Sequence, residues 1–409
     1  MANTYTTYKD SGIPWIGDIP KDWNCQRLRF LCEINTGNQD TQNKEENGKY
    51  PFYVRSPHIE RCNNYTFEGE SILMAGDGAG AGRVFHHAFG KYAVHQRVYI
   101  LYNIRNINSF FLFYYISNLF ADVMDAGSAQ STVPSVRLPM LSNFCVCIPT
   151  TKEQESIANF LDKKCSEIDE LISLQEKMID ELKAYKQSVI TEAVTKGLDR
   201  NVKMKDSGIP WIGEIPKEWE TFKIKQLLKN KSVKGFPNER VLSLYRDLGI
   251  VYKDSRDDNH NVTSEDTSSY KLVDVGDFVL NKMKAWQGSM AVSNYRGIIS
   301  PAYYICTFNR SDVCKRYVHY LLRNDTYKPE YMRLSSGLRI GQWDLNIDDF
   351  LNISMVFPPL DEQESIANFL DEKCSEIDSL ISIKEKKIEE LKDYKKSLIY
   401  EYVTGKKRV

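Results

Sequence analysis

The chain has 409 residues, with 54 Lys and Arg against 55 Asp and Glu, and its 42% hydrophobic content is ordinary for a globular protein. Its length predicts two or three domains, and its densest apolar run, at 110–116, is far shorter than the roughly 20 residues that span a bilayer. The nine cysteines form no CxxC pair and the first residues lack a secretory signal, so we expect a soluble, intracellular protein with reduced thiols.

The first element along the chain is a segment that occurs twice. Residues 9–23 read KDSGIPWIGDIPKDW and residues 205–219 read KDSGIPWIGEIPKEW; we call these copies the frame segments. Because two copies are too few for a solenoid, the repeat predicts pseudo-twofold symmetry within one chain. Either core packing or contact with a partner explains the frame tryptophans, which are Trp15, Trp23, Trp211 and Trp219.

Between the repeated parts lie two variable segments, about 24–150 and 220–358, with almost no similarity to each other. Both combine apolar strand patterns with an amphipathic helix, which predicts mixed α/β domains of one shared fold. In the first we expect strands at 71–75, 83–85, 97–101 and 144–148 and a helix at 110–124. In the second we expect strands at 277–280, 289–293, 303–308 and 353–357 and a helix at 313–323.

A second repeated element follows each variable segment. Residues 153–195 return at 362–404 with about three-quarters of the positions identical. Apolar residues recur every three or four positions, and neither Gly nor Pro interrupts them before Gly197 and Gly405. This pattern predicts two helices of about 40 residues, roughly 60 Å long. We expect the equivalent Cys165 and Cys374 to be small buried side chains.

Each long helix carries one apolar stripe that needs a long partner. The linker at 198–204 is short, so the second helix can bury its stripe by running back along the first. The sequence therefore predicts an antiparallel two-helix coiled coil with a globular domain at each end. Two separate coils, each paired with another subunit, would leave both stripes exposed in the monomer. The predicted stripes are Ile157, Phe160, Leu161, Ile168, Leu171, Ile172, Met178, Ile179, Leu182, Tyr185 and Val189, and then Ile366, Phe369, Leu370, Ile377, Leu380, Ile381, Ile388, Leu391, Tyr394 and Leu398.

The variable segments hold no recognisable catalytic motif. GDGAGAGR at 76–83 lacks the GK[ST] ending of a phosphate-binding P-loop, so a turn or a β-bulge is favoured there. His86, His87 and His95 lack the partner set of a metal site. The sequence has neither the [DN]PP[YF] tetrapeptide of amino-methyltransferases nor a convincing nuclease cluster. We therefore expect a protein that reads its ligand and has no catalytic centre or bound metal.

The frame SGIPWIG[DE]IPK[DE]W, a variable domain and a helix opening with EQESIANFLD all occur twice. This arrangement resembles the specificity (S) subunit of type I restriction-modification systems over essentially the whole chain. The resemblance implies two α/β (α+β) target-recognition domains joined by the antiparallel coiled coil. The implied parts are a frame with the first recognition domain at 1–150, a spacer helix at 151–197, a linker with the second frame at 198–219, the second recognition domain at 220–359 and a C-terminal spacer helix at 360–409.

The resemblance also implies a function. Each recognition domain reads one half of a bipartite, asymmetric double-stranded DNA target, and the helices set the gap between the halves. Two methyltransferase (M) subunits dock on the chain and use S-adenosylmethionine to methylate adenine N6. Up to two motor-nuclease (R) subunits, with ATP and Mg, restrict DNA. The chain itself would bind no cofactor and act as a non-catalytic subunit in the cytoplasm of a bacterium or archaeon.

Candidate DNA contacts follow from the chemistry of base edges and phosphates, which Arg, Lys, Gln, Ser, Thr and aromatic side chains on loops can meet. In the first segment we predict contacts by Arg55, Ser56, His58, Arg83, His86, Lys91, Gln96, Arg97, Ser128, Gln130 and Ser131. In the second we predict Lys234, Arg246, Lys282, Lys284, Trp286, Gln287, Arg296, Arg333, Ser336, Arg339 and Gln342. The alternative for each is a solvated surface side chain.

Two rival functions remain open from the residues alone. A self-contained restriction-modification enzyme would need the catalytic motifs that are missing. A coiled-coil scaffold without DNA binding would not need two diversified domains.

Overall fold

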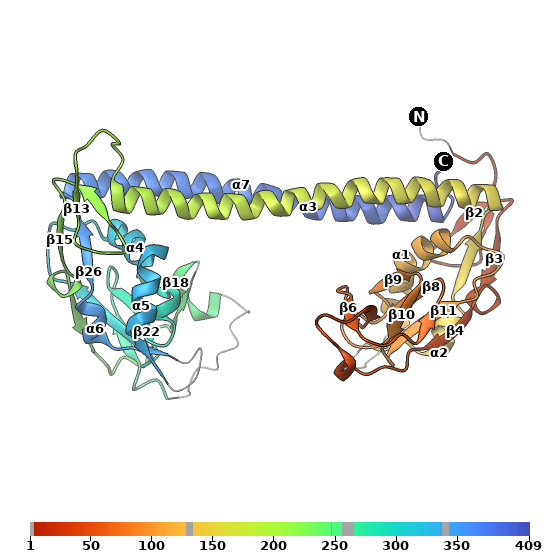
Figure 1. Ribbon diagram of the computed structural model, residues 1–409, viewed down its shortest axis with the longest axis horizontal. Coiled ribbons are helices and arrows are strands. Elements are labelled where there is room, and N and C mark those ends of the chain that lie inside the picture. The colour runs from red at the N-terminus through yellow and green to blue at the C-terminus, as the bar shows by residue number, and fades with distance from the viewer. Residues whose placement is uncertain (1–3, 128–133, 247, 256–265, 338–342) are drawn as a thin grey trace. The chain divides into compact units, whose positions relative to one another are not determined.

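The computed structural model describes residues 4–127, 134–246, 248–255, 266–337 and 343–409 (Figure 1). The chain forms two compact units, residues 1–176 with 385–409 and residues 177–384. Each unit therefore combines one frame segment and one variable segment with parts of both long helices. Within the described residues, no helix is both long enough and apolar enough to cross a membrane.

In the first unit the frame forms a hairpin and the variable segment forms two sheets. Strand β1 (Tyr8–Asp10) pairs with β2 (Asp18–Pro20), and β3 (Asn24–Arg27) pairs with β12 (Cys145–Ile148), both antiparallel. The main sheet is antiparallel, in the order β4 (Glu33–Thr36), β11 (Val98–Tyr102), β8 (Ser71–Ala75), β9 (Phe85–Ala88). The second sheet has the order β6 (Glu60–Cys62), β5 (Tyr50–Tyr53), β10 (Lys91–Val94), β7 (Phe67–Glu68). The helices are α1 (Ser109–Gly127), α2 (Leu138–Ser142) and the first part of α3 (Thr151–Lys196).

The second unit repeats this plan. Its frame hairpin joins β13 (Met204–Asp206) to β14 (Glu214–Pro216), and β15 (Glu220–Lys223) pairs with β26 (Ser354–Phe357). The main sheet has the order β16 (Leu228–Lys231), β23 (Tyr303–Phe308), β20 (Phe278–Asn281), β21 (Met290–Val292). Smaller pairs are β17 (Leu242–Tyr245) with β18 (Gly249–Tyr252), β19 (Lys271–Val273) with β22 (Gly297–Ile299) and β24 (Ser335–Ser336) with β25 (Asp344–Leu345). The helices are α4 (Lys315–Arg323), α5 (Lys328–Leu334), α6 (Ile347–Leu351), the second part of α3 and the first part of α7 (Leu360–Val403).

The main sheets are covered on both faces, which explains their nearly continuous apolar strands. In β8, Ile72 and Met74 join the core with α1, whereas Leu73 joins residues of the second sheet. In β20, Phe278 and Leu280 face the helical core and Val279 faces the small strand pairs. The predicted shared fold of the two variable segments is thus confirmed, with the same sheet order in each.

One predicted strand, at 83–85, was placed too early. The backbone N–H groups of Arg83 and Val84 both donate to the carbonyl of Gly80, which keeps these residues in a turn. Strand β9 consequently begins at Phe85. The turn itself agrees with the interpretation of the glycine-rich run 76–83.

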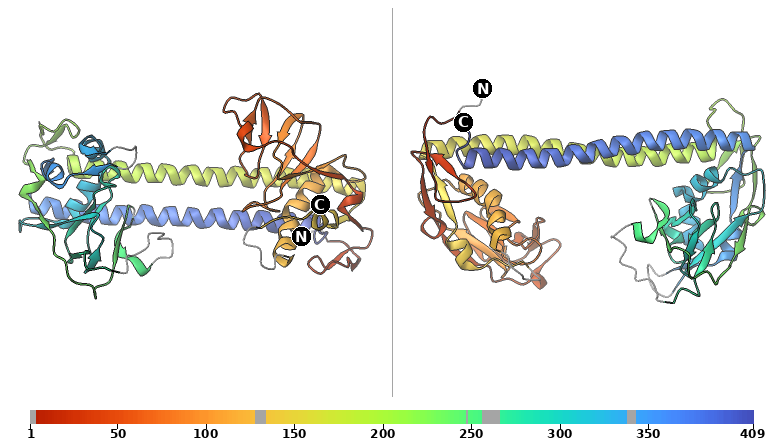
Figure 2. Two further views of the ribbon diagram at one scale, coloured as in Figure 1. Left: turned by 90° about the horizontal axis from the view of Figure 1, so that it is seen from below. Right: turned by 180° about the vertical axis from the view of Figure 1, so that it is seen from behind.

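The long helices pair antiparallel inside each unit. In the first unit, Lys395 Nζ of α7 lies 2.6 Å from a carboxylate oxygen of Asp169 of α3. In the second, Lys186 Nζ of α3 lies 2.7 Å from Asp378 of α7. The two ion pairs join equivalent positions of the repeat, because Asp169 corresponds to Asp378 and Lys186 corresponds to Lys395. The start of each long helix lies beside the end of the other in all views (Figures 1 and 2). The predicted antiparallel coil is confirmed.

Buried polar contacts at the start of each long helix are also duplicated. The side-chain oxygen of Gln154 accepts from the N–H of Asn108, and its Nε2 donates to the carbonyl of Pro149. Gln363 makes the same two bonds with Cys314 and Pro358. Buried side-chain amides need such partners, so each glutamine ties its helix to its own domain.

The frame tryptophans divide into two kinds. Trp23 and Trp219 are fully buried core residues, whereas Trp15 is 42% exposed. The frame packs on the end of a long helix: a Cβ on Gly405, which has φ of 70°, would meet Pro20 at 2.3 Å and Trp23 at 3.2 Å. Core packing therefore accounts for the two innermost tryptophans.

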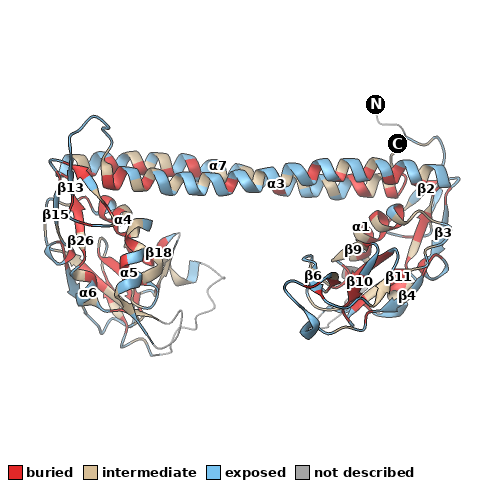
Figure 3. Ribbon diagram, viewed as in Figure 1, coloured by how far each residue is buried: buried red, intermediate tan, exposed pale blue. Residues whose placement is uncertain are grey.

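The helix pair does not bury the whole predicted stripe. Cys165, Cys374 and most stripe positions are buried or half-buried, as expected. Leu171, Met178 and Tyr185 of α3, and Leu380 and Tyr394 of α7, are instead exposed (Figure 3). A single partner helix covers only a narrow seam, so the outer apolar positions remain at the surface.

Candidate nucleic-acid interface

In the first unit a forked ion pair gathers two of the predicted DNA contacts. Asp77, in the turn after β8, accepts from Nη1 of Arg55 at 2.7 Å and from Nη1 of Arg97 at 2.6 Å. Burial opposes ionisation of Asp77, but the hydrogen bonds from both arginines outweigh it and hold its pKa below the usual range. The carboxylate is mostly covered while both guanidinium groups reach solvent, so Asp77 presents two fixed cationic donors.

Neighbouring candidates surround this fork. His86 Nε2 lies 3.0 Å from the carbonyl of Ser56, and burial lowers the pKa of His86, so the ring is neutral near pH 7. Gln96 is exposed and donates to Asp40 at 3.0 Å. Arg55, Ser56, His86, Gln96 and Arg97 therefore form one group, which we call the first-unit cluster.

Of the other candidates in the first segment, Lys91 lies apart from this cluster and His58 is bonded to it. Lys91 is at the opposite end of β10, with its ammonium 4.7 Å from the centre of the Tyr65 ring and 3.8 Å from Glu68. His58 and Arg83 are exposed, and the N–H of His58 donates to Ser56 Oγ. Ser128, Gln130 and Ser131 lie outside the described residues.

In the second unit several candidates gather around a pair of indoles. The rings of Trp286 and Trp343 lie edge to face with their centres 5.3 Å apart. Lys282 forms a 3.2 Å ion pair with Asp344, beside Trp343 in the chain. Arg246 donates to Gln287 at 3.3 Å. We call Arg246, Lys282, Lys284, Trp286 and Gln287 the second-unit cluster.

The remaining candidates of the second segment are held differently. Arg296 bonds Glu239 and Asp274, and Arg333 forms a two-pronged ion pair with Glu330. Lys234 is exposed, and Ser336 lies in β24 opposite Asp344. Arg339 and Gln342 lie outside the described residues.

Comparison with known proteins identifies the family. The family model described as "Type I restriction modification DNA specificity domain" matches residues 20–184 and 216–393, which is most of the chain. The chain belongs to this family.

Known proteins of this type are similar to the chain over most of its length. The type I restriction enzyme MjaVIII specificity subunit of Methanocaldococcus jannaschii is 26% identical, over 96% of this chain and 94% of that protein. The EcoDI specificity subunit of Escherichia coli is 22% identical, over 89% and 84%. A solved structure addressing complex assembly and conformational transition of the type I R-M system contains a chain of TM-score 0.67 and 14% identity, covering 94% of this chain and 98% of that one.

As a type I specificity subunit, the chain is the DNA sequence-specificity component and not the enzyme of its system. The family therefore decides among the three functions considered from the sequence, in favour of the specificity subunit. A self-contained enzyme and a scaffold without DNA binding are both set aside.

Sequence reasoning missed the acidic and aromatic residues that organise this specificity subunit's clusters. Asp77 lies inside the glycine-rich run 76–83, for which the sequence predicted a turn or a β-bulge and no role for this carboxylate. Trp343 and Asp344 lie far along the chain from Trp286 and Lys282, and no sequence pattern links the two pairs. Among the described residues, no group of three or more His, Cys, Asp or Glu side chains is arranged to hold a metal ion.

Proposed function

We propose that this specificity subunit reads a bipartite, asymmetric DNA target, one half with the domain in residues 1–150 and the other with the domain in residues 220–359. The observation that carries the proposal is the contrast inside the chain. Contacts that attach each domain to the helices are duplicated, as Gln154 and Gln363 show. In contrast, the first-unit cluster and the second-unit cluster differ in composition: both contain arginine and glutamine, but the first adds serine and histidine and the second adds lysines and a tryptophan.

The clusters suit this role because their side chains match what base edges and phosphates present. Arginine and glutamine donors read purine edges in the major groove, and lysines hold phosphates. The indole of Trp286 adds an apolar surface beside Lys282 and Lys284. The other predicted residues remain candidates. For Arg296 and Arg333, DNA would have to compete with the carboxylates that already bind them.

Exchange of one domain tests the proposal directly. Replacing residues 220–359 by the corresponding domain of another specificity subunit is expected to change one half of the methylated sequence and leave the other half as it was. The reason is that the first domain keeps its own cluster and its own attachment to the helices. Sequencing that maps methylated adenines in host DNA measures the result. A change in both halves would contradict separate reading.

A second experiment tests the fork in the first unit. Asp77→Asn keeps the size of the side chain but removes the charge that holds Arg55 and Arg97. We expect the ratio of target to non-target affinity to fall about tenfold, within the roughly 1–3 kcal/mol that one well-placed base contact provides. Non-target affinity should not fall, because a negative charge has been removed.

Glu68→Gln is the matched control, since it removes one carboxylate from β7, opposite Lys91 of β10. It should leave the affinity ratio unchanged. Equal ratios for Asp77→Asn, Glu68→Gln and the unaltered chain, measured by fluorescence anisotropy, would remove the fork from the reading surface.

We further propose that two M subunits dock on duplicated apolar patches of the helix pair. In the first unit the patch is Leu171, Leu174 and Tyr394; in the second it is Leu380, Ile383 and Tyr185. Each of the six is at least 47% exposed, and the sets are equivalent in the repeat. Exposed apolar groups of this kind mark protein contacts, and two equivalent sets fit two copies of one partner.

In this assembly the cofactors belong to the partners. S-adenosylmethionine in the M subunits would supply the methyl group for adenine N6, and ATP with Mg would serve up to two R subunits. The specificity subunit would act in the cytoplasm of a bacterium or archaeon, where it determines which adenines the M subunits reach.

A further inference from the structure

Two cysteines of the first unit face each other across a pair of strands. Cys25 of β3 and Cys147 of β12 are direct partners in the antiparallel register, and their sulfur atoms lie 2.8 Å apart. Strand β3 begins the first variable segment and β12 is its last strand. The register therefore brings two thiols together from the two ends of one domain, 122 positions apart in the chain.

The place of this pair in the strand ladder suits a covalent bond. The N–H of Leu28 donates to the carbonyl of Phe144, and these two residues are opposite each other when the register is extended by one position. Hydrogen-bonded and non-hydrogen-bonded pairs alternate along antiparallel strands, so Cys25 and Cys147, three positions away, are a non-hydrogen-bonded pair. The Cα atoms of such pairs are about 4.5 Å apart, within the roughly 4.4–6.8 Å that a disulfide requires.

The two thiols differ in their surroundings. Cys25 is exposed, whereas Cys147 is buried in the core of the unit. The hydrogen bond with Cys147, aided by the charge of Lys9, outweighs burial and lowers the pKa of Cys25. The same hydrogen bond, together with burial, raises the pKa of Cys147. Cys25 is therefore the thiol that ionises first and that a dissolved oxidant can reach.

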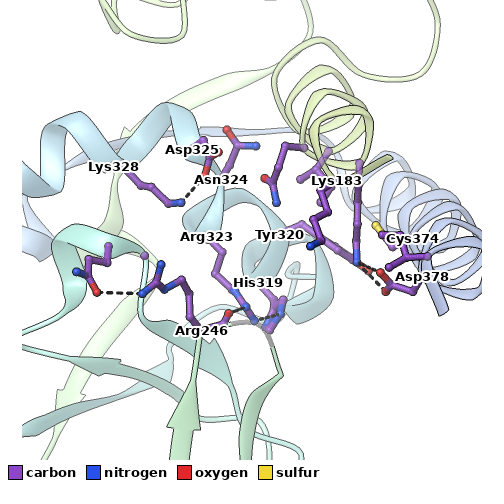
Figure 4. Close-up of a pocket in the computed structure, with 16 residues that line it drawn as sticks. Lys183, Arg246, His319, Tyr320, Arg323, Asn324, Asp325, Lys328, Cys374 and Asp378 are labelled. Atoms are coloured by element: carbon purple, nitrogen blue, oxygen red, sulfur yellow. Dashed lines mark hydrogen bonds and ion pairs between the residues drawn. The ribbon is translucent and has the colours of Figure 1, made fainter. Parts of the chain in front are cut away.

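Four other cysteines are buried thiols with the opposite tendency. Burial raises the pKa of Cys32 and of Cys306 to about 12 and that of Cys165 to about 11. Cys374 lines a cavity of about 710 Å³ in the second unit (Figure 4), and burial raises its pKa as well. Because the thiolate is the reactive form, these four thiols are expected to oxidise more slowly than Cys25.

We propose that Cys25 and Cys147 are a redox-sensitive pair, which a peroxide joins in a cross-strand disulfide. The bond would close a loop that contains both sheets of the first recognition domain and the first-unit cluster, so it would connect the two ends of that domain covalently. The proposal goes beyond DNA reading, because neither cysteine belongs to the cluster.

The reaction needs one peroxide for each disulfide. The Cys25 thiolate attacks one oxygen of hydrogen peroxide, the O–O bond breaks and, with one proton taken up, a sulfenic acid and water result. The sulfur of Cys147 then attacks the sulfur of Cys25 and breaks its S–O bond. The hydroxyl group leaves with the thiol proton of Cys147 as a second water. In all, two thiols lose two electrons and the peroxide is reduced to water.

The equivalent strands of the second unit carry other side chains. Thr221 of β15 follows Trp219 by two positions, as Cys25 follows Trp23, and its partner across the ladder is Val356 of β26. A hydroxyl group and an isopropyl group cannot form this bond. Oxidation at these strands is therefore expected to stabilise the first recognition domain and to leave the second as it was.

The test uses the full-length chain, freed of reductant and treated with about one equivalent of hydrogen peroxide. The remaining thiols are alkylated, and the peptides are analysed by mass spectrometry. We expect a disulfide-linked pair of peptides that contain Cys25 and Cys147, with two fewer alkylated cysteines than in the reduced chain. The Tm should rise by roughly 5 °C or more, because closing so long a loop restricts the unfolded chain.

Two variants serve as controls. Cys25→Ser, at an exposed position, should give neither the linked peptides nor the rise in Tm. Cys145→Ser removes the other thiol on the same face of β12 and should keep both. Oxidation of Cys25 to a sulfinic acid while Cys147 stays a thiol would overturn the proposal, as would a disulfide that joins two chains through Cys25. An equal rise in Tm for Cys25→Ser, or linked peptides without any rise, would show that the bond does not stabilise the domain as proposed.

Discussion

Replacing Leu380 and Ile383 by glutamate is expected to leave one M subunit bound in place of the two that we propose for the unaltered chain. Both side chains are exposed in the second unit, at 47% and 65%, so the change does not enter the core. Two charges in an apolar contact would each have to lose water without a partner, which costs several kcal/mol in all. Native mass spectrometry of the chain mixed with M subunits gives the number bound.

The repeat supplies the matched control for this experiment. Leu171→Glu with Leu174→Glu alters the equivalent patch of the first unit and should also leave one M subunit. All four substitutions together should leave none, with the helical circular dichroism signal unchanged. Retention of two M subunits by the fourfold variant would remove these patches as the docking sites.

Lengthening both long helices is expected to lengthen the gap in the recognised DNA. The Lys186–Asp378 ion pair sets a register in which Glu181 of α3 lies opposite Ile383 of α7, so an insertion after Glu181 is matched by one after Ser382. Four residues inserted after each position add roughly one turn, about 6 Å, and nearly preserve the apolar stripe. Since one base pair occupies about 3.4 Å, the gap in the methylated motif should grow by one or two base pairs.

Insertion in α3 alone is the informative control for the paired change. It shifts the register beyond Glu181, separates Lys186 from Asp378 and should lower thermal stability. The paired insertion should keep both half-site sequences, since neither cluster is touched. Adenine mapping that shows the original gap at full methylation would contradict the spacing role.

Periodicity and repetition along the chain predicted the long helices. Two helical stripes without Gly or Pro can satisfy their backbone locally, so both long helices were predicted close to their observed bounds. Their antiparallel pairing followed from the short linker alone. The exposure of Leu171, Met178, Tyr185, Leu380 and Tyr394 was not predicted, because a periodic pattern does not state how many partner helices are present.

The candidate DNA contacts show where residue-type reasoning ends. Arg55 and Arg97 were predicted singly, from their chemistry, and their common anchor Asp77 was not. Trp286 was predicted as a contact and Trp343 was not, because 57 positions along the chain separate them. In the structure the centres of the two rings are 5.3 Å apart. Such pairs join segments that only the sheet topology brings together.

The sequence by itself determined the duplication, the two helices, the shared fold of the variable domains and the family. Each of these depends on local periodicity or on matching residues, which are visible along one dimension. Only the tertiary structure decided that each compact unit takes parts of both helices, which apolar positions stay exposed, and which charges meet. The Cys25–Cys147 pair is of this second kind, because 122 positions separate the two thiols and only the strand register brings them together.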